Sequence, residues 1–263
     1  MPSAAALPTE PKEAVEPNDA LWDRIQVEQL EIFDSSRARV HHLARAVRAH
    51  GPVLNIGIGA GYLEQELIGW GTPVYTIDPS ARSVGLLQQR LGLSDEVCVG
   101  RAEQLPYEDN FFGAVVVAEV LEHLTNTVLE QALAEIHRVL RPGGFIIGTV
   151  PARERLANQT VVCPSCQCQF HRWGHYQSFT AGRMRELLAR TFEVDYSIER
   201  PLVCWKSLNW VGRAIAAAKL GLYYLGRHGS GENLVFKASK TDVDPMHPLI
   251  AVTDHHRRAS TTA

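Results

Sequence analysis

Two glutamates and a histidine, Glu119, Glu122 and His123, stand close together near the middle of the chain. Carboxylates and an imidazole together can hold a divalent cation of the Mg²⁺ or Mn²⁺ kind, and Zn²⁺ is also compatible with them. The same groups can remove a proton from a hydroxyl. We therefore expect these three residues to be catalytic, with a divalent cation as a candidate partner. The alternative is that the Glu-His pair only begins a helix and that His123 borders a substrate without a metal.

A second group of candidate ligands follows, in which Cys163 and Cys166 precede His171 and His175. These residue types at this spacing are typical of a small tetrahedral zinc knuckle, with Cys168 as a substitute ligand. A zinc ion here would be structural and would hold an otherwise irregular insert in place. The alternative is a surface loop that carries reduced thiols.

His175 belongs to both predicted metal groups. A histidine that binds the zinc cannot also complete a cation site with Glu119, Glu122 and His123. The partners of His175 would therefore distinguish a structural zinc from a catalytic metal.

Three glycines, Gly57, Gly59 and Gly61, follow a short apolar run at 53–56. Glycines at such a place let the chain turn sharply from strand to helix and let its backbone approach a ligand closely. Asp78 ends the next apolar run, where a nucleotide-binding protein carries the acid that contacts a ribose. A dinucleotide, a phosphate or S-adenosylmethionine would each suit this arrangement.

Expected strands alternate with expected helices around these residues. We expect strands at 53–56, 74–77, 96–99, 114–118 and 145–150. We expect the intervening helices at 62–70, 80–91 and 127–140. This rhythm predicts an α/β protein with a Rossmann-like, open, mostly parallel sheet and helices on both faces. With two later strands, at 192–198 and 233–238, the sheet would have about seven strands. Ligands bind at the carboxyl ends of such strands.

The rest of the chain divides into one core domain at 19–239 and two flanking segments. Residues 1–18 and 240–263 are expected to be a disordered leader and tail. Within the core, a Cys/His-rich insert is expected after the fifth strand, at 153–180. A helical region at 202–232 is expected to form a lid on the substrate side. We favour interior packing for it over a membrane surface, because Arg213 and Lys219 are few cations for a membrane helix.

Composition bounds the function classes. The 263 residues have a net charge of −3 and are 45% hydrophobic, as in an ordinary globular protein. The charge disfavours nucleic acid as a partner. No stretch approaches the roughly 20 apolar residues of a membrane span, and no signal peptide is recognisable, so we expect a cytoplasmic protein without integral membrane association. The sequence does not indicate an oligomeric state.

Five segments in order resemble the motifs of class I S-adenosylmethionine-dependent methyltransferases, particularly the branch that contains the ubiquinone and menaquinone biosynthesis methylases. These segments are 53–61, 75–80, 100–106, 117–124 and 138–144. The resemblance implies a methyl donor site. The residues it assigns to that site are Asn55, Gly57, Gly59, Gly61, Tyr62, Asp78, Pro79, Arg101, Ala102, Glu103, Ala118 and Glu119.

Three positions depart from the family pattern, which has Asp at each. Asn55 accepts a hydrogen bond but brings no negative charge to the donor. Arg101 cannot accept a bond from the adenine amino group, so we expect the backbone near Ala102 to contribute more there. Gly113 is the third departure.

The favoured function is methyl transfer to a hydroxyl of a small molecule such as a sugar, polyketide or quinone-like compound. Aromatic residues after 150, including Trp173, Tyr176 and Trp205, could contact the acceptor. Segments 119–123 and 175–180 also resemble metal-binding parts of small-RNA 2′-O-methyltransferases, which leaves an RNA acceptor as an alternative. A nicotinamide-dependent oxidoreductase should show a Tyr-x-x-x-Lys pair, and none is found. A non-catalytic zinc-bearing binding module should fail to bind S-adenosylmethionine.

Overall fold

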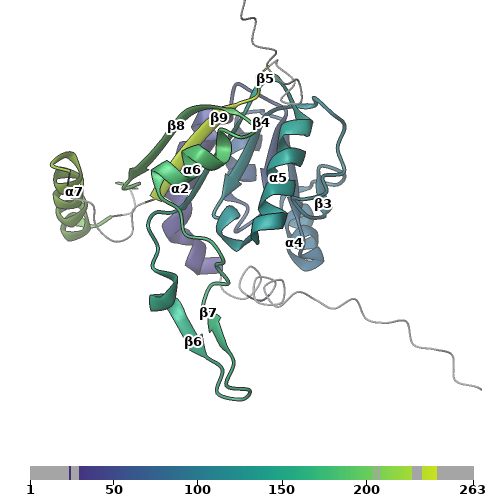
Figure 1. Ribbon diagram of the computed structural model, residues 1–263. Coiled ribbons are helices and arrows are strands. Elements are labelled where there is room, and N and C mark those ends of the chain that lie inside the picture. Colours follow the sequence, from purple (N-terminus) through teal and green to yellow (C-terminus); the bar gives the residue numbers. More distant parts are fainter. Residues whose placement is uncertain (1–23, 25–29, 204, 206–207, 227–232, 242–263) are drawn as a thin grey trace, which may run out of the picture.

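The computed structural model describes residues 24, 30–203, 205, 208–226 and 233–241. Its centre is a seven-stranded sheet in the order β3-β2-β1-β4-β5-β9-β8 (Figure 1). The strands are β1 (Val53–Ile56), β2 (Val74–Asp78), β3 (Val97–Val99), β4 (Phe112–Ala118), β5 (Leu140–Pro151), β8 (Glu193–Arg200) and β9 (Asn233–Ser239). The pairs from β3 to β5 are parallel, whereas β9 runs antiparallel to both β5 and β8. The predicted Rossmann-like α/β fold is confirmed.

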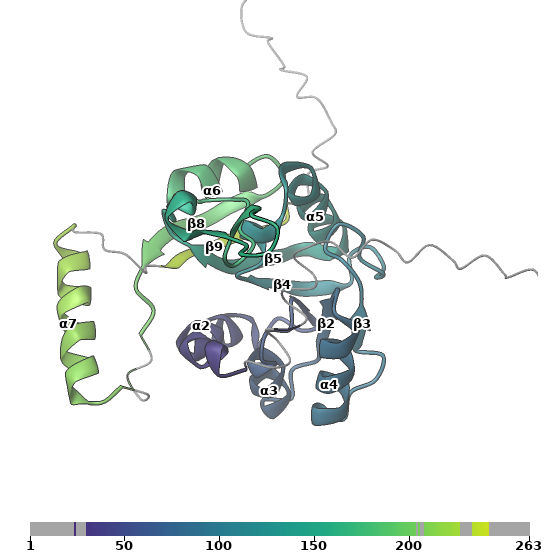
Figure 2. The same cartoon turned by 90° about the horizontal axis from the view of Figure 1, so that it is seen from below.

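Helices cover both faces of the sheet because its central strands are buried on both sides. Every residue of β1 is buried, as expected of an apolar strand between two parallel neighbours. Figure 2 shows α2, α3 and α4 on one face and α5 and α6 on the other. Their bounds are α2 (Arg37–Val47), α3 (Tyr62–Gly69), α4 (Ala81–Leu91), α5 (Asn126–Val139) and α6 (Ala181–Leu188).

The chain before β1 forms two helical segments. A 3-10 segment, η1 (Leu30–Ser36), ends where α2 begins. Leu43 and Val47 of α2 pack against Leu63 and Leu67 of α3 in one of the buried clusters. The leader at 1–18 and nearly all of the tail lie outside the described residues.

The insert after β5 is a β-hairpin rather than an irregular segment. A short 3-10 turn, η3 (Leu156–Gln159), leads into β6 (Thr160–Val162), which pairs antiparallel with β7 (Gln169–His171). The hairpin extends away from the sheet (Figure 1). Its β-branched and aromatic residues Val161, Val162 and Phe170 favour strand, although all three are exposed.

The helical region between β8 and β9 does not form the predicted lid. Its helix α7 (Trp210–Tyr224) stands away from the sheet in both views (Figures 1 and 2). Ala216 is the only buried residue of this helix, so the predicted interior packing is wrong. The reason is topological: β8 is the edge strand, and β4, β5 and β9 separate it from β1 and β2 in the sheet.

Candidate active site

A cavity of about 800 Å³ opens at the carboxyl ends of β1, β2 and β4. Most of the predicted donor-site residues line it. They are Asn55, Gly57, Gly59, Tyr62, Asp78, Pro79, Arg101, Ala102, Glu103, Ala118 and Glu119. Of the predicted catalytic residues, Glu119 and His123 line this cavity and Glu122 does not. Parallel strands end at one edge of the sheet, so residues far apart in sequence meet there.

The loop after β1 has the backbone conformation that its glycines allow. Gly57 has φ +90°, which places its peptide in a region that side chains disfavour. Gly61 has φ +70° and is the N-cap of α3; it does not itself line the cavity. A side chain at Gly61 would collide with Leu87 and Arg90 of α4. Arg90 in turn donates a hydrogen bond to the Ala60 carbonyl at 2.6 Å, so α4 fixes the loop from behind.

Asn55 belongs to a buried polar network under this loop. Its Nδ2 donates to the Gly57 carbonyl at 3.0 Å and to Oε1 of Glu64 at 2.6 Å. The same Glu64 oxygen accepts a bond from the Thr76 hydroxyl at 2.8 Å. Burial raises the pKa of Glu64, while its bonds from Asn55 and Thr76 lower it in part. The negative charge expected at position 55 is therefore absent, and a carboxyl group from α3 lies next to it.

Asp78 holds two loops at the end of β2. Its Oδ2 accepts a bond from the Ile58 backbone N–H and its Oδ1 one from the Ser80 N–H, both at 2.9 Å. The side chain is almost fully buried and lines the cavity. A carboxylate at the end of this strand can accept a hydrogen bond from a ribose hydroxyl. Together with the glycine loop, Asp78 makes a cavity that fits S-adenosylmethionine.

The loop at 101–107 on the opposite side of the cavity is fixed by α5. Arg138 donates to the carbonyls of Leu105 and Tyr107 at 2.9 and 2.7 Å. Glu135 accepts a bond from the Leu105 N–H at 2.9 Å and also pairs with Arg138. The bonds to Glu135 raise the pKa of Arg138 further above its ordinary value. Glu135 and Arg138 thus fix the loop that we expect to contact the adenine. Glu135 lies outside the five segments that resemble family motifs, so the sequence did not indicate its role.

Gly113 is required by packing. A side chain there would meet the His50 carbonyl and the Arg141 guanidinium at less than van der Waals distance. The aspartate expected at this position would not fit the present backbone. This departure from the family pattern is therefore a local packing feature of β4, remote from the donor site.

Glu119 follows β4 in a strained conformation and lies near Arg39 of α2. Its φ of +57° is rare for a residue other than glycine and marks the turn into η2 (Leu121–His123). Its Oε1 lies 3.8 Å from Nε of Arg39. The N-terminal segment also contributes Phe33 and Val40 to the cavity wall. Sequence reasoning missed these three residues, because an amphipathic helix pattern does not show which part of it faces a ligand.

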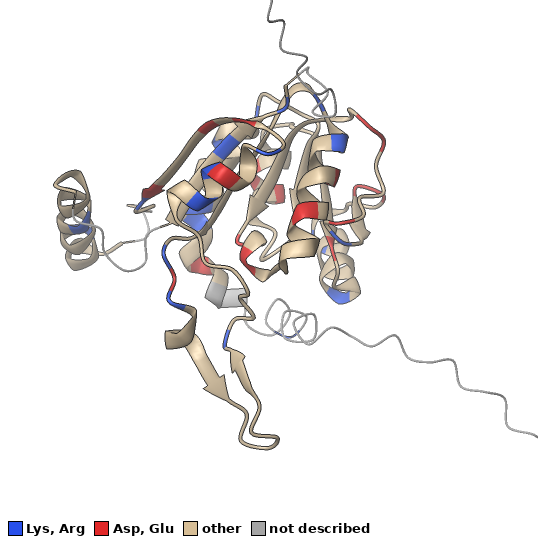
Figure 3. Ribbon diagram, viewed as in Figure 1, with Lys and Arg blue, Asp and Glu red and all other residues tan. Residues whose placement is uncertain are grey.

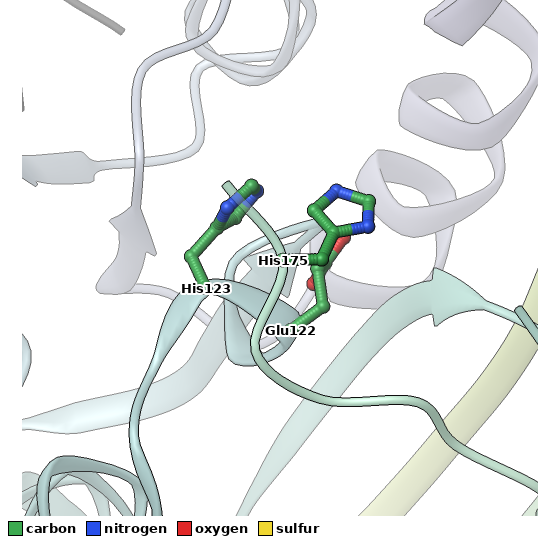
Figure 4. Close-up of side chains that lie close together, drawn as sticks. All are labelled: Glu122, His123 and His175. Carbon is green, nitrogen blue, oxygen red and sulfur yellow. The ribbon is translucent and has the colours of Figure 1, made fainter. Parts of the chain in front are cut away.

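The structure brings Glu122, His123 and His175 together, with their ligand atoms within 4.8 Å of one another (Figure 4). Glu119 is not part of this group, and His175 takes its place beside Glu122 and His123. The backbone N–H groups of Tyr176 and Gln177 donate to the Glu122 carbonyl at 2.8 and 3.0 Å, which fixes the end of the insert against η2. The resemblance of segment 175–180 to the RNA enzymes was the only sequence signal for this contact.

Glu122 is a buried carboxyl group whose two oxygens have no hydrogen-bond partner among the described residues. Burial, and then the negative charge of Glu119, raise the pKa of Glu122 well above its ordinary value. Burial lowers the pKa of His123 to about 3, with His175 as a further cause. An uncharged imidazole and an unpartnered carboxyl group are ready to bind a cation, which would satisfy both oxygens.

The hydrogen bonds of the three histidines indicate which ring nitrogens could bind a metal. Nδ1 of His175 lies 2.5 Å from Oε2 of Glu154, and Nδ1 of His123 lies 3.3 Å from the Gly174 carbonyl. A carbonyl and a carboxylate accept hydrogen bonds, so both Nδ1 atoms donate, and Nε2 is the ring nitrogen of each that could bind a metal. His171 differs, because its Nδ1 accepts bonds from the backbone N–H groups of Trp173 and His175. Its Nε2 lies 3.5 Å from Glu154, and His171, Glu154 and His175 form a second group of close ligand atoms.

The predicted zinc set of Cys163, Cys166, His171 and His175 is not assembled in the structure. No group of close ligand atoms in the described part of the chain contains a cysteine. The hairpin is the reason: the cysteines lie at its tip, and β7 carries the chain from there to His171, at roughly 3.3 Å per residue. Cys166 and the substitute Cys168 are joined to each other in a disulfide. A zinc ion at this insert stays a prediction.

The fold and the cavity define an S-adenosylmethionine-binding Rossmann-like domain. Residues 54–148 match the family model described as "Methyltransferase domain". This segment is a class I methyltransferase domain, and the resemblance predicted from the sequence is confirmed for it. This match argues against the two alternatives from the sequence, a nicotinamide-dependent oxidoreductase and a non-catalytic zinc-bearing binding module.

Two curated relatives cover the same region. The ubiquinone/menaquinone biosynthesis C-methyltransferase UbiE of Hahella chejuensis is 38% identical over 38% of this chain and 43% of its own length. The ubiquinone biosynthesis O-methyltransferase of Agrobacterium fabrum is 30% identical over 40% of this chain and 44% of its own. The chain thus spans less than half the length of these relatives.

Solved structures extend the likeness of the fold. The 1,6-didemethyltoxoflavin-N1-methyltransferase of Burkholderia thailandensis, solved with S-adenosylhomocysteine, superposes with a TM-score of 0.58 at 21% identity. The alignment covers 85% of this chain and 87% of that one. At this identity the likeness concerns the fold alone.

Proposed function

We propose that the protein transfers a methyl group from S-adenosylmethionine to a hydroxyl oxygen of a small molecule. The observation that carries the proposal is the buried, unpartnered carboxyl group of Glu122 beside His175 and beside His123, which lines the donor cavity. A sugar, polyketide or quinone-like compound is the expected acceptor. The names of the two relatives above include both a C- and an O-methyltransferase, so the choice of oxygen rests on this side-chain group.

The donor supplies an electrophilic methyl group, and displacement of it needs the acceptor in line with the carbon–sulfur bond. The glycine loop and Asp78 would hold the donor, and the 101–107 loop would contact its adenine. The space left for the acceptor is mainly apolar, with Phe33, Val40 and Tyr176 in its wall. The guanidinium of Arg39 lies at its side.

A divalent cation would be held by Glu122, His123 and His175, with Glu119 as a further candidate ligand. Bound there, it would lower the pKa of an acceptor hydroxyl. The carboxylates favour Mg²⁺ or Mn²⁺, while the second imidazole that the structure adds makes zinc a stronger competitor. Glu154 would act as a positioning residue, because its carboxylate fixes the tautomer of His175.

An RNA acceptor is less well supported. The chain has a net charge of −3, and binding to a nucleic-acid backbone depends on cations that neutralise phosphates. A cytoplasmic location remains a prediction from the sequence. Among the described residues, no helix is long and apolar enough to cross a membrane.

The test is transfer of radiolabelled methyl from S-adenosylmethionine to a panel of catechols, sugars and hydroxylated polyketides. We expect a product with a new methyl ether, formed faster with added Mn²⁺ or Zn²⁺ and lost with a chelator. Glu122→Gln should lose the metal dependence, whereas the exposed Glu130→Gln serves as matched control. A product methylated on carbon or nitrogen would overturn the hydroxyl assignment, and full activity of Glu122→Gln would overturn the cation site.

A further inference from the structure

Helix α7 exposes a continuous apolar face. Val211, Ile215 and Leu222 are all at least 42% exposed, and Leu225, just after the helix, is 79% exposed. Together with Ala218 they follow one another at steps of four and three residues, which places them on one face of the helix. Large apolar side chains gathered on an exposed face mark a binding surface.

The charges of this helix have one sign. Its sequence, WVGRAIAAAKLGLYY, contains Arg213 and Lys219 and no acidic residue. Figure 3 shows blue and no red on α7, although the whole chain has a net charge of −3. Two copies of a helix that pair through such a stripe usually carry charges of both signs beside it. The lack of carboxylates in the helix instead complements an anionic surface.

Aromatic residues lie at both ends of the helix. Trp210 begins it and is 80% exposed, and Tyr224 ends it and is 77% exposed. Amphipathic rings of this kind prefer the boundary between hydrocarbon and water. At 15 residues, α7 is shorter than the roughly 20 residues that cross a bilayer. Its geometry therefore suits a helix that lies in a membrane surface.

We propose that α7 binds the surface of an anionic lipid bilayer, with the face formed by Val211, Ile215, Ala218, Leu222 and Leu225 turned into the headgroup region. Lys219, at the border of this face, then contacts a lipid phosphate, whereas Arg213 lies on the opposite side of the helix and donates to the carbonyls of Trp205 and Leu208. In the sequence, the small number of cations favoured interior packing over a membrane surface. The structure instead leaves this face of α7 without a protein partner among the described residues. The catalytic domain is thereby held at the membrane without crossing it.

Vesicle flotation of the full chain tests the proposal. The probes are vesicles of phosphatidylcholine alone and of phosphatidylcholine with an equal part of phosphatidylglycerol. We expect flotation with the mixed vesicles, less with the neutral ones, and a decrease at high salt. Ile215→Glu/Leu222→Glu should lower the bound fraction by about tenfold or more. Ile68→Glu/Leu86→Glu places the same charges at similarly exposed apolar positions of α3 and α4 and should float like the wild type.

Folding and self-association are controlled separately. The α7 variant should keep the wild-type melting temperature and S-adenosylmethionine affinity, because its two sites face solvent. Wild-type protein that fails to float, equal flotation with neutral and mixed vesicles, or a variant that floats like the wild type would each overturn the proposal. So would light scattering that shows a lipid-free dimer which the variant dissociates, since a second copy would then cover the face.

Discussion

Nδ2 of Asn55 lies 2.6 Å from Oε1 of Glu64, beneath the loop that would hold the methyl donor. The amide also donates to the Gly57 carbonyl, so one side chain joins the loop to a buried carboxyl group of α3. An aspartate at position 55 has no hydrogen to donate to either partner. Asn55, where the family pattern has an acid, is therefore suited to its neighbour Glu64, because asparagine can donate a hydrogen bond to that carboxyl group.

Asn55→Asp should destabilise the protein. It places a second carboxylate against Glu64 and removes both donated bonds, a loss of about 2–4 kcal/mol in the free energy of unfolding. Denaturant unfolding of the variant at neutral pH measures this. The double variant Asn55→Asp/Glu64→Gln restores one donor and removes one charge, so it should recover most of the loss. An Asn55→Asp variant as stable as the wild type would contradict a stabilising role of the hydrogen bond from Asn55 to Glu64.

Glu64 should make the stability fall as pH rises. Burial raises its pKa in the folded protein above the ordinary value of 4.5, so the folded state binds the proton more tightly than the unfolded state. The stabilisation is fully present below 4.5 and is lost as pH passes through the raised value. Glu64→Gln cannot ionise. The difference in unfolding free energy, wild type minus variant, should therefore decrease as the pH rises above 4.5. The exposed Glu130→Gln should show no such trend, and a flat difference for Glu64→Gln would refute the prediction.

Arg138→Ala should weaken binding of S-adenosylmethionine. The guanidinium holds the carbonyls of Leu105 and Tyr107, so its loss frees the loop that carries Ala102 and Glu103. We expect Kd to rise about tenfold, equivalent to about 1.4 kcal/mol. Isothermal titration measures it, with Arg190→Ala, an exposed arginine paired with Glu130, as the control. Unchanged affinity would show that the loop keeps its conformation without Arg138.

Glu154→Gln should weaken cation binding without removing a ligand. Its carboxylate accepts the Nδ1 proton of His175 and so leaves Nε2 free for the metal. A glutamine is uncharged, and its amide can present either its oxygen or its NH2 group to His175, so the imidazole becomes a poorer ligand. Titration with Mn²⁺ should show a Kd higher by about 10–100-fold. Glu186→Gln on the exposed face of α6 is the control, and an unchanged Kd for Glu154→Gln would leave Glu154 without this role.

The fold could be predicted from sequence because its signals are local. The apolar runs at 53–56 and 114–118 and the glycines after the first one each specify their own conformation. The site was less predictable, because its partners are distant in sequence. Glu64 and Glu154 are ordinary acids in the chain, and only the folded sheet brings them to Asn55 and His175. The zinc set failed to assemble in the structure because ligand spacing does not show that a strand separates the cysteines from the histidines.

Cys163→Ser/Cys166→Ser should leave the cation site at Glu122, His123 and His175 intact. The cysteines lie at the hairpin tip, and no described cysteine is grouped with these ligands. The double variant should therefore bind Mn²⁺ with wild-type affinity, whereas His175→Ala should lose most of it, because a ligand nitrogen is gone. Metal analysis of the purified proteins adds the zinc content. Zinc that disappears in both variants would show that His175 joins the cysteines in a knuckle, and the structure of the insert would then differ from the hairpin described above.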